Sequence, residues 1–541
     1  MRRWNGWGDE SQDFPLKHDG QVFLEDRLGP ARPLADARLD QVIATVPPSR
    51  LPDHRLISID AEDRVRHARG QSFADWLALR SGEFGTFPDG VAHPRGGDDI
   101  RELLDFCARE GVTAIPYGGG TSVVGHVTPL ASERPVLTID LGGMNKLIEL
   151  DRESQIATFG PGTPGPLIED ELRAEGFTLG HFPQSFELST AGGWVATRSS
   201  GQQSLRYGRI EQMFAGGRLE TPAGTLEIPT FPASAAGPDL REMILGSEGR
   251  LGILSEVKLR VTPLPERESF HVAFLPGWRS ARELVRTVAQ GKVQLSMLRL
   301  SNPTETATHL TLAGHARAVG WLKRYLSVRG LGDDKCMLTY GLTGSRAQCR
   351  AAHRQIKHAI KAAGGVNTGT ALGRKWRQTR FRSPYLRNGL WRAGYCVDTL
   401  ETSADWRNVD ALEAAIERTL HDALAAEHEP VHVFTHLSHV YAQGSSIYTT
   451  YVFRCAETYE QTHERWRRLK RAGSRAIVAG GGSISHHHGV GVDHASYLHA
   501  EKGALGLAAI GALAKTFDPA GIMNPGKLLP DNRADAEDGG E

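Results

Sequence analysis

Residues 116–122 read Pro-Tyr-Gly-Gly-Gly-Thr-Ser, and this loop indicates which fold its flanking segments form. Its three glycines expose closely spaced backbone N–H groups, and Thr121 and Ser122 add hydroxyl groups. Such a loop can surround a phosphate or a pyrophosphate. It matches neither the G-x-G-x-x-G of a dinucleotide fold nor the Gly-Lys-Ser/Thr end of a P-loop, so alone it fits a plain tight turn equally well.

The residues just before this loop predict a helix followed by a strand. Apolar residues recur at helical spacing from residue 98 to Cys107, and Gly111 is placed to end the helix. Residues 112–116 then read as a short strand. A helix, a strand and a glycine loop in close succession indicate an α+β unit that binds its ligand at the loop.

Short strands and turns continue beyond the loop, and longer helices follow residue 265. The sequence predicts strands at 136–141, 147–150, 156–159, 254–261, 431–437 and 447–453, and helices at 167–175, 280–289, 347–363 and 409–425. It also predicts a turn of small residues at 192–197 and a hairpin at 218–228 with Ala223-Gly224 at its turn.

The change from short strands and glycine-rich loops to longer helices, together with the composition of the two ends, divides the chain into five parts. We expect an irregular N-terminal extension at 1–87, a cofactor domain at 88–265, a substrate domain at 266–474, a C-terminal segment at 475–530 that folds back to complete the site, and a disordered acidic tail at 531–541. The length of 541 residues also exceeds what one hydrophobic core usually supports.

Composition excludes several classes of protein. Lys+Arg and Asp+Glu both number 63, so no net basic field attracts nucleic acid. Five cysteines without a C-x-x-C spacing argue against a disulfide framework or a zinc ribbon, and they favour a reducing compartment. No apolar run is long enough to span a membrane.

Two more loops are rich in small residues. Residues 183–201 are dense in glycine, serine and threonine, and residues 246–252 read Gly-Ser-Glu-Gly-Arg-Leu-Gly. Three such loops in one domain suggest a long ligand that is held at several points. A dinucleotide fits that requirement better than a simple phosphate does.

Three consecutive histidines, His486, His487 and His488, precede the glycines of residues 489–491. Imidazoles titrate near neutrality and carry protons readily, so the run is a candidate wall of an active site. A metal site and an inert solvated loop are the alternatives. In an extended segment the outer two side chains share one face and the middle one opposes them, whereas metal ligands usually converge from spaced positions. The spacing disfavours a metal, and together with the loops and segments considered next it leads us to expect none.

In this order, the three loops resemble the PCMH-type FAD-binding domain of the vanillyl-alcohol oxidase superfamily. Within it, the sequence resembles the alkyldihydroxyacetonephosphate synthase family, flavoenzymes of ether-lipid synthesis. Four further segments are similar to that family: residues 4–8 (Trp-Asn-Gly-Trp-Gly), 400–406, 441–448 and the histidine loop 485–491. The resemblance implies an α+β fold with a two-part FAD-binding domain, an α+β substrate domain and a C-terminal helical segment that returns to the site.

The resemblance also implies which residues contact FAD. These are Pro116, Tyr117, Gly118, Gly119, Gly120, Thr121, Ser122, Gln184, Ser185, Phe186, Glu187, Leu188, Ser189, Thr190, Thr197, Arg198, Ser199, Ser200, Glu248, Gly249, Arg250, Leu251, Gly252, Ile253 and Leu254. No histidine lies within 117–122, where some relatives tether the flavin, although His126 lies just beyond. We therefore predict dissociable, non-covalent FAD.

Other residues carry chemistry by the same resemblance. Tyr448 corresponds to a tyrosine that moves a proton at C1 of the substrate; the alternative is a strand tyrosine packed in the core. A tyrosine pKa near 10 requires nearby cations or donors for a base role. Arg387 corresponds to a substrate-binding arginine whose fork suits a phosphate, against the alternative of a surface ion pair. Arg299 matches a functionally important arginine, against an arginine at a strand edge, and the histidine loop is implied to face flavin and substrate.

The implied reaction exchanges the acyl chain of 1-acyl-dihydroxyacetone phosphate for a long-chain alcohol, with the flavin as a covalent handle at N5 and no net oxidation. It requires an anion site, a proton shuttle and an apolar tunnel. An FAD-dependent 2-hydroxyacid dehydrogenase or oxidase is the alternative on the same fold, and a flavin-binding protein without enzymatic activity is a third. The tyrosine segment and the triple histidine favour the synthase.

The expected partners are small-molecule lipid substrates and no nucleic acid. A peripheral membrane contact through Trp4 and Trp7 and a homodimer are left open. Residues 492–497 read Val-Asp-His-Ala-Ser-Tyr, where animal synthases have a more basic stretch. No peroxisomal segment precedes Trp4, and the last three residues are not Ser-Lys-Leu, so we expect a cytoplasmic location, at a membrane surface or free of it.

Overall fold

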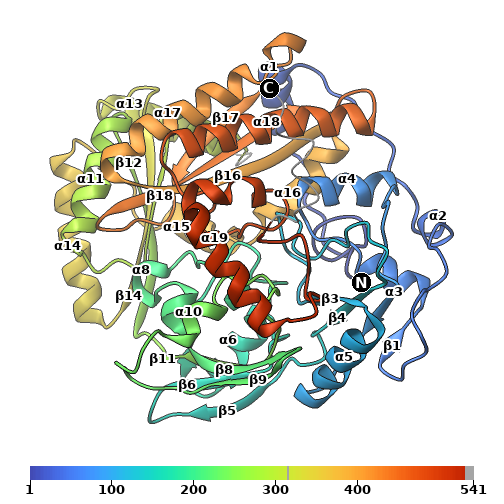
Figure 1. Ribbon diagram of the computed structural model, residues 1–541. Coiled ribbons are helices and arrows are strands. Elements are labelled where there is room, and N and C mark those ends of the chain that lie inside the picture. Colours follow the sequence, from blue (N-terminus) through green and yellow to red (C-terminus); the bar gives the residue numbers. More distant parts are fainter. Residues whose placement is uncertain (313–315, 530–541) are drawn as a thin grey trace.

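The computed structural model describes residues 1–312 and 316–529, which form four β-sheets and the helices that pack on them (Figure 1). The acidic tail predicted at 531–541 lies outside the described residues. Within the described ranges, no helix combines the length and the apolar character that a bilayer crossing requires.

The first glycine loop follows the strand that the sequence predicts. Helix α5 (Gly97–Glu110) ends at Gly111, whose φ of 67° favours glycine because a Cβ would be strained there. Strand β3 (Thr113–Tyr117) then pairs in parallel with β4 (Val136–Asp140), which pairs in parallel with β2 (Gly90–Ala92). Strand β1 (Ile57–Ser58) completes this sheet in the order β1-β2-β4-β3. The predicted helix and strand are confirmed.

The other two loops, residues 183–201 and 246–252, lie in the sequence between strands of a second sheet. Its order is β5-β6-β10-β8-β9, made of β5 (Leu147–Asp151), β6 (Ile156–Phe159), β10 (Ile253–Arg260), β8 (Phe214–Thr221) and β9 (Gly224–Ile228). Helix α6 (Gly165–Ala174) matches the predicted helix, and its neighbour β7 (Phe177–Thr178) pairs with β11 (Thr262–Pro263). Because β9 begins at Gly224, the hairpin turn falls one residue before the predicted position.

The turn predicted at 192–197 is wrong. These residues form helix α7 (Ala191–Ala196), which begins directly after Thr190. Glycine is a poor helix former, but a Cβ at Gly192 would lie 2.8 Å from the side chain of Pro161. Close packing against this segment therefore requires the small residue, and tertiary contacts override local propensity.

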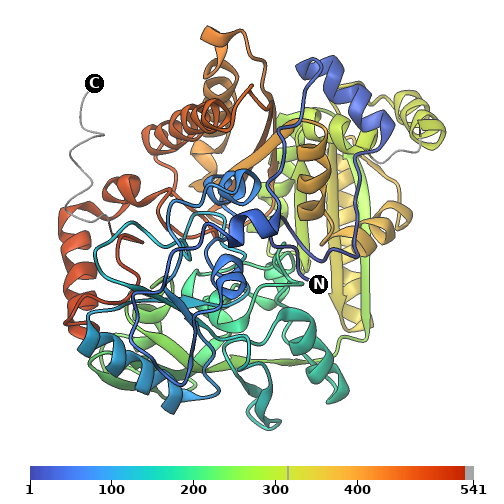
Figure 2. The same ribbon diagram turned by 90° about the vertical axis from the view of Figure 1, so that its right-hand side faces the viewer.

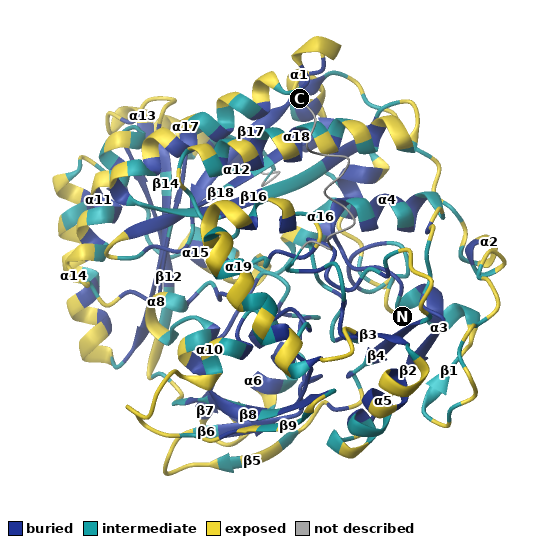
Figure 3. Cartoon of the chain, in the orientation of Figure 1, coloured by how far each residue is buried: buried dark blue, intermediate teal, exposed yellow. Residues whose placement is uncertain are grey.

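The third large sheet has seven antiparallel strands in the order β15-β12-β14-β13-β17-β18-β16. They are β12 (Arg267–Leu275), β13 (Met297–Ser301), β14 (Cys336–Gly344), β15 (Val366–Asn367), β16 (Tyr395–Asp405), β17 (His432–Leu437) and β18 (Gly444–Arg454). One face packs on helices α11 (Trp278–Gln290), α14 (Arg346–Ala362), α17 (Trp406–Asp422) and α18 (Tyr459–Ala479). Figure 3 shows most of this sheet buried, β16 partly so, and the outer faces of these helices exposed.

Alternation along the strands separates the two faces of this sheet. In β18, Ile447, Tyr451 and Phe453 belong to the core under the helices, whereas Tyr448 and Val452 point to the other side. The same period of two holds in β13, β14, β16 and β17. The second face is therefore free to line a ligand cavity.

The N-terminal residues are not an irregular extension. They form α1 (His18–Leu28), α2 (Leu39–Ile43), α3 (Ala61–Arg66) and α4 (Phe73–Ser81). Phe73 and Trp76 of α4 belong to the core of the seven-stranded sheet. Figure 2 shows this blue segment crossing from the lower sheets to the upper right of the molecule, where α1 lies.

The C-terminal segment returns to the first glycine loop. Helix α19 (Leu498–Phe517) precedes a stretch in which the Ile522 carbonyl accepts from the Ala114 N–H at 2.8 Å. The Asn524 N–H donates back to the Ala114 carbonyl at 2.9 Å. The last described residues thus extend along β3 beside residues 116–122. Remaining helices are α8 (Ser204–Tyr207), α9 (Ile210–Met213), α10 (Leu240–Ile244), α12 (Pro303–Leu312), α13 (Ala316–Val328), α15 (Ala371–Thr379) and α16 (Ser383–Arg392).

Candidate active site

A cavity of about 960 Å³ separates the free face of the seven-stranded sheet from the three glycine-rich loops. One wall consists of residues 116–123, parts of 183–200 and parts of 247–254. The opposite wall is built by strands β12, β13, β14, β16, β17 and β18. A volume of this size suits a cofactor together with a substrate.

The register of three strands aligns polar residues across the sheet. Glu401 of β16 lies opposite Tyr448 of β18, and Tyr448 lies opposite His436 of β17. His436 in turn pairs with Ser301 of β13, which shares its face with Arg299 two residues earlier. Directly opposed residues point to the same face, so the register alone places these side chains in one row.

Along the same strands the cavity becomes apolar. Beyond Tyr448 the cavity side of β18 continues with Thr450 and Val452, and β17 contributes Phe434. Leu310 of α12 and Leu390 of α16 cover this end. The cavity therefore has a polar end at the row of titratable residues and an apolar arm that leads away from it.

Arg387 faces the cavity from α16 with an incompletely satisfied guanidinium. One terminal nitrogen donates to the Gln71 carbonyl at 2.7 Å, and the guanidinium lies 4.3 Å from the ring centre of Trp76. Nε and the second terminal nitrogen are buried and have no hydrogen-bond partner among the described residues. Burial lowers the pKa of Arg387 to about 10, so it stays charged at neutral pH. The alternative of a surface ion pair is not what the structure shows.

Arg299 belongs to a buried ion network beside the row. Its guanidinium donates to Glu305 at 2.9 Å, and Glu305 also lies 2.8 Å from Nδ1 of His436. Although burial would raise it, His436 and Arg299 hold the pKa of Glu305 well below its usual range. Arg299 is therefore committed to holding Glu305 and His436, while still lining the cavity.

Tyr448 lies between two imidazoles. Its ring stacks on His436 with centroids 4.7 Å apart, and His488 approaches edge-on at 5.8 Å. Its hydroxyl lies 3.4 Å from the Thr399 hydroxyl. Burial, followed by the charge of Glu401, raises the pKa of Tyr448 above its usual value. The side chain is therefore a protonated phenol at neutral pH.

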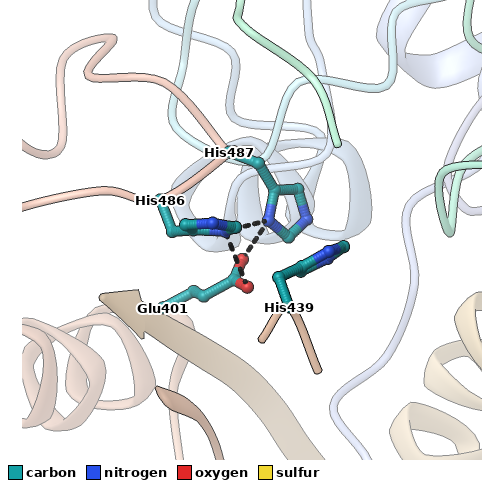
Figure 4. A group of neighbouring side chains, drawn as sticks. All are labelled: Glu401, His439, His486 and His487. Atoms are coloured by element: carbon teal, nitrogen blue, oxygen red, sulfur yellow. Dashed lines mark hydrogen bonds and ion pairs between the residues drawn. The ribbon is translucent and has the colours of Figure 1, made fainter. Parts of the chain in front are cut away.

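The histidine loop is bent, which changes the expected geometry. An extended segment would have turned the middle side chain away from the outer two, but residues 486–488 form consecutive bends. All three imidazoles consequently face Glu401: Nδ1 of His486 at 3.3 Å, Nδ1 of His487 in direct contact and Nε2 of His488 at 3.8 Å. Figure 4 shows His486 and His487 meeting this carboxylate, with His439 beside them.

The three histidines differ in what else they contact. Nε2 of His486 accepts from Arg209 at 2.8 Å and lies 2.7 Å from the Tyr441 hydroxyl. Because a guanidinium only donates, the ring proton of neutral His486 must sit on Nδ1, toward Glu401. His487 and His488 line the cavity wall, and His486 is buried behind them.

Four residues of this cluster could offer ligand atoms to a metal ion. The ligand atoms of Glu401, His439, His486 and His487 lie within 4.8 Å of one another. Arg209, however, donates to His486 and places a positive charge beside the cluster, which opposes a cation there. We therefore interpret the cluster as imidazoles gathered around a carboxylate.

Known proteins share both the sequence and this architecture. Residues 88–228 match the FAD binding domain family, and residues 264–528 match the C-terminal domain of FAD linked oxidases. The alkyldihydroxyacetonephosphate synthase of Caenorhabditis elegans is 30% identical over 97% of this chain and 95% of its own. This chain belongs to the alkyldihydroxyacetonephosphate synthase family. The predicted α+β class and the FAD cofactor are confirmed.

Two more members of the synthase family agree with this assignment. The Dictyostelium discoideum protein is 29% identical over 98% of this chain and 93% of its own. A solved alkyldihydroxyacetonephosphate synthase structure has a TM-score of 0.83 and 27% identity, covering 97% of this chain and 98% of that one. The synthase prediction is thereby supported over the 2-hydroxyacid oxidoreductase.

The glycine loops fit the FAD that this synthase family uses. A Cβ at Gly118 would lie 2.5 Å from Oγ1 of Thr190, and one at Gly119 would overlap the Leu188 carbonyl oxygen. Glycines are therefore required here because the first loop packs directly against residues 188–190 of the second loop. Thr190 Oγ1 is buried without a hydrogen-bond partner among the described residues, as expected for a group that awaits a cofactor oxygen or nitrogen.

Most of the FAD contacts expected for a synthase line the cavity. Six of them do not: Phe186, Glu187, Leu188, Arg198, Arg250 and Leu251. Phe186 stacks on Phe381 at 4.8 Å, Glu187 accepts from the Tyr385 hydroxyl, and Arg250 donates to the Met523 carbonyl. They support the loops from behind.

Glu248 has a specific task in this synthase-family site. Its carboxylate accepts from the backbone N–H groups of Val490 at 2.6 Å and Gly491 at 2.8 Å. It also lies 3.0 Å from Nε2 of His126, whose Nδ1 is 2.8 Å from the Ser122 hydroxyl. The third glycine loop thus holds the histidine loop and, through His126, connects it to the first.

Sequence reasoning missed four residues of this synthase-family site. Glu401, His436, His439 and Glu305 were not singled out, although Glu401 lies within the family segment 400–406. Its place within that family segment was the available signal for Glu401. His436 and Glu305 become visible only through strand register and packing.

Proposed function

We propose that this protein exchanges the acyl chain of 1-acyl-dihydroxyacetone phosphate for a long-chain alcohol and so forms an ether-lipid precursor. The observation that carries the proposal is one continuous cavity. It joins the buried guanidinium of Arg387, which has two donors without hydrogen-bond partners among the described residues, a row of proton carriers and an apolar arm. A 2-hydroxyacid oxidoreductase needs no such arm.

Arg387 is the proposed phosphate site. Its Nε and free terminal nitrogen present the planar fork that binds phosphate oxygens in a bidentate manner. Gln71 connects this site to the first glycine loop, since its carbonyl accepts from Arg387 and its N–H donates to the Ser122 carbonyl at 2.6 Å. The phosphate would therefore lie next to the cofactor.

The apolar arm is the proposed binding site for the acyl and alkyl chains. Val452, Phe434, Leu310 and Leu390 provide an apolar surface beyond the polar row, interrupted by Thr450 and His432. Burying a methylene group contributes about 0.8 kcal/mol, so a long chain in this arm supplies most of the binding energy. The phosphate and the chain together fix C1 of the substrate near Tyr448.

Proton transfer is assigned to Tyr448 and the histidine loop. In the exchange the acyl C1–O bond breaks, the alcohol oxygen bonds to C1, and the alcohol proton leaves with the released fatty acid. Tyr448 is a phenol and can give its proton before it accepts one at C1. Bound FAD, held without a covalent bond by the glycine loops, supplies the redox-neutral chemistry at C1.

The division of the chain follows from these roles. Residues 88–265 hold FAD, residues 266–474 hold the lipid, and residues 475–530 bring the histidine loop between them. The contacts of Glu248 with Val490 and Gly491 support this arrangement.

A peripheral membrane contact is assigned to α13 and not to the N-terminal tryptophans. Trp7 is only 6% exposed, whereas Trp321, Tyr325 and Val328 lie exposed on α13 at helical spacing. The buried side of α13 packs in the same apolar cluster as Leu310 of the cavity arm. Substituting the three exposed residues with serine should reduce sedimentation with phospholipid vesicles while activity on detergent-dispersed substrate persists.

One assay tests the function. Purified protein with FAD is incubated with labelled hexadecanol and palmitoyl-dihydroxyacetone phosphate, and separately with D-2-hydroxyacids and a dye acceptor. We expect a labelled ether product and released palmitate in equal amounts. Flavin bleaching by D-lactate without any ether product would overturn the proposal.

A further inference from the structure

Glu401 is a carboxylate that three histidines surround. It lies in the middle of β16, is 4% exposed and faces the site beside Tyr448. Burial opposes its ionisation, but the imidazoles of His487 and His486 hold the pKa of Glu401 well below its usual range. A buried carboxylate is costly unless it is paired, so the histidines and the carboxylate must be considered together.

The neighbouring rings can be separated by their partners. His486 uses Nε2 for Arg209 and lies outside the cavity wall. His488 stays 3.8 Å from the carboxylate, beyond hydrogen-bond distance, and burial lowers its pKa to about 3. His439 places Nδ1 3.1 Å from the Ser200 hydroxyl. Among the described residues, His487 alone combines direct contact with Glu401 and a position in the cavity wall.

We propose that Glu401 is the positioning residue of His487: it accepts the Nδ1 proton, fixes the ring, and leaves Nε2 as the proton acceptor for the incoming alcohol. The inference rests on the proposed function. The alcohol O–H bond breaks as Nε2 takes the proton, the alcohol oxygen bonds to C1, and the acyl C1–O bond gives its electron pair to the departing carboxylate. Glu401 stabilises the imidazolium, as a carboxylate does behind a general-base histidine.

The charges around the pair agree with this role. Several titratable groups surround the pair. They are Arg209, Tyr441, Tyr448 and the imidazoles of His181, His436, His439 and His488, with Lys470 beyond His488. The pKa values of His439 and His486 are lowered by burial, so these two imidazoles enter as neutral groups. Glu401 is then the anion against which a proton on His487 is balanced.

The first measurement is independent of turnover. In FAD-loaded protein labelled with ¹⁵N-histidine, His487→Asn identifies the Nδ1–H signal of His487. We expect that hydrogen-bonded signal in the wild-type protein and its loss or displacement in Glu401→Gln. Glu413→Gln, the same change in a buried glutamate on α17 at the other face of the sheet, should leave it in place. An unchanged signal in Glu401→Gln overturns the proposal.

The second measurement uses ether formation. Glu401→Gln should bind FAD and keep the KM for the phosphate substrate within about threefold, while kcat falls about 100-fold. Removing the anion in direct contact with His487 should shift the acid limb of the kcat profile, whereas a loss of packing alone should not. Glu401→Asp, which restores the charge with a shorter reach, should recover part of kcat.

The outcomes separate the possible failures. Absence of ether product in the wild-type protein with an intact His487 signal would overturn the proposed function but not the positioning role. Parallel losses of FAD, KM and kcat in Glu401→Gln, with no shift of the acid limb, would show a structural carboxylate and overturn the positioning role. One equivalent of tightly bound divalent metal in the active wild-type protein, lost in Glu401→Gln, would overturn it as well.

Discussion

Arg387 is expected to affect stability and substrate binding in opposite directions. The ligand-free protein buries its Nε and one terminal nitrogen without partners. A buried donor that lacks a partner costs about 1–3 kcal/mol. In the wild-type protein the guanidinium lies 4.3 Å from the ring centre of Trp76. Arg387→Met removes the cost of the unpaired donors and keeps an unbranched side chain over that ring. The free energy of unfolding of the ligand-free protein should therefore rise by about 1 kcal/mol or more.

The same change should remove the phosphate fork. A hydrogen bond to a charged group contributes about 1.5–3 kcal/mol. Loss of a bidentate pair of such bonds should therefore cost about 3 kcal/mol of binding free energy, once the solvation of the free phosphate is counted. At 1.36 kcal/mol for each factor of ten, kcat/KM should fall by roughly 150-fold. Arg387→Lys keeps the charge without the fork and should fall between the two.

The assay measures thermal unfolding of the ligand-free protein and kcat/KM of the same preparation after FAD is added. Arg380→Met is the matched control, since Arg380 also stacks on an aromatic ring, at 4.4 Å from the centre of Phe182, but has a partner in Gln203. It should lower stability and change kcat/KM by about twofold or less. If Arg387→Met instead lowers the melting temperature and leaves kcat/KM within threefold of wild type, Arg387 is a structural residue and the reasoning is refuted.

Four other predictions follow from the same site. Tyr448→Phe should retain FAD and lose about 10²–10³-fold in kcat for ether product, because only the proton-carrying hydroxyl is removed. Denaturation should release FAD into the supernatant; yellow colour that stays with the protein contradicts this. Glu248→Gln should weaken the hold on Val490 and Gly491, seen as faster amide exchange there, with about a tenfold loss in kcat. Burial raises the pKa of Glu413 to about 8, so its protonated form stabilises the fold below pH 4.5 and that contribution disappears toward pH 8; Glu413→Gln should flatten this dependence in melts.

Local sequence signals predicted the parts of the fold that are locally determined. The helix before the first glycine loop ends at Gly111, which adopts a positive φ. Glycine is the residue that most readily takes this conformation, so its presence in the sequence predicts the end of the helix. The helix α7 was missed because its glycines have low helix propensity. Gly192 is required there by its close packing against Pro161, which the sequence alone does not show. The N-terminal helices were missed for a related reason: the burial of Phe73 and Trp76 depends on a sheet that forms much later in the chain.

The site was predictable in kind and not in geometry. Tyr448, Arg387, Arg299 and the histidine loop could be named through family resemblance, and the structure brings all of them to one cavity or directly behind it. The orientation of the histidines could not be predicted, since no local pattern signals the bends at 486–488 that bring their rings to Glu401. Those contacts join segments that are distant in the chain.

The register of the seven-stranded sheet explains how this arrangement places a lipid. Each strand residue advances the chain by about 3.3 Å, so Val452 lies about 13 Å along β18 from Tyr448 on the same face. A shift of one residue between β16 and β18 would remove Glu401 from Tyr448 and exchange the apolar arm for the core residues Tyr451 and Phe453. The pairing that buries the core therefore also fixes the distance from the proton carriers to the apolar arm, and substrate orientation follows from the same packing that stabilises the fold.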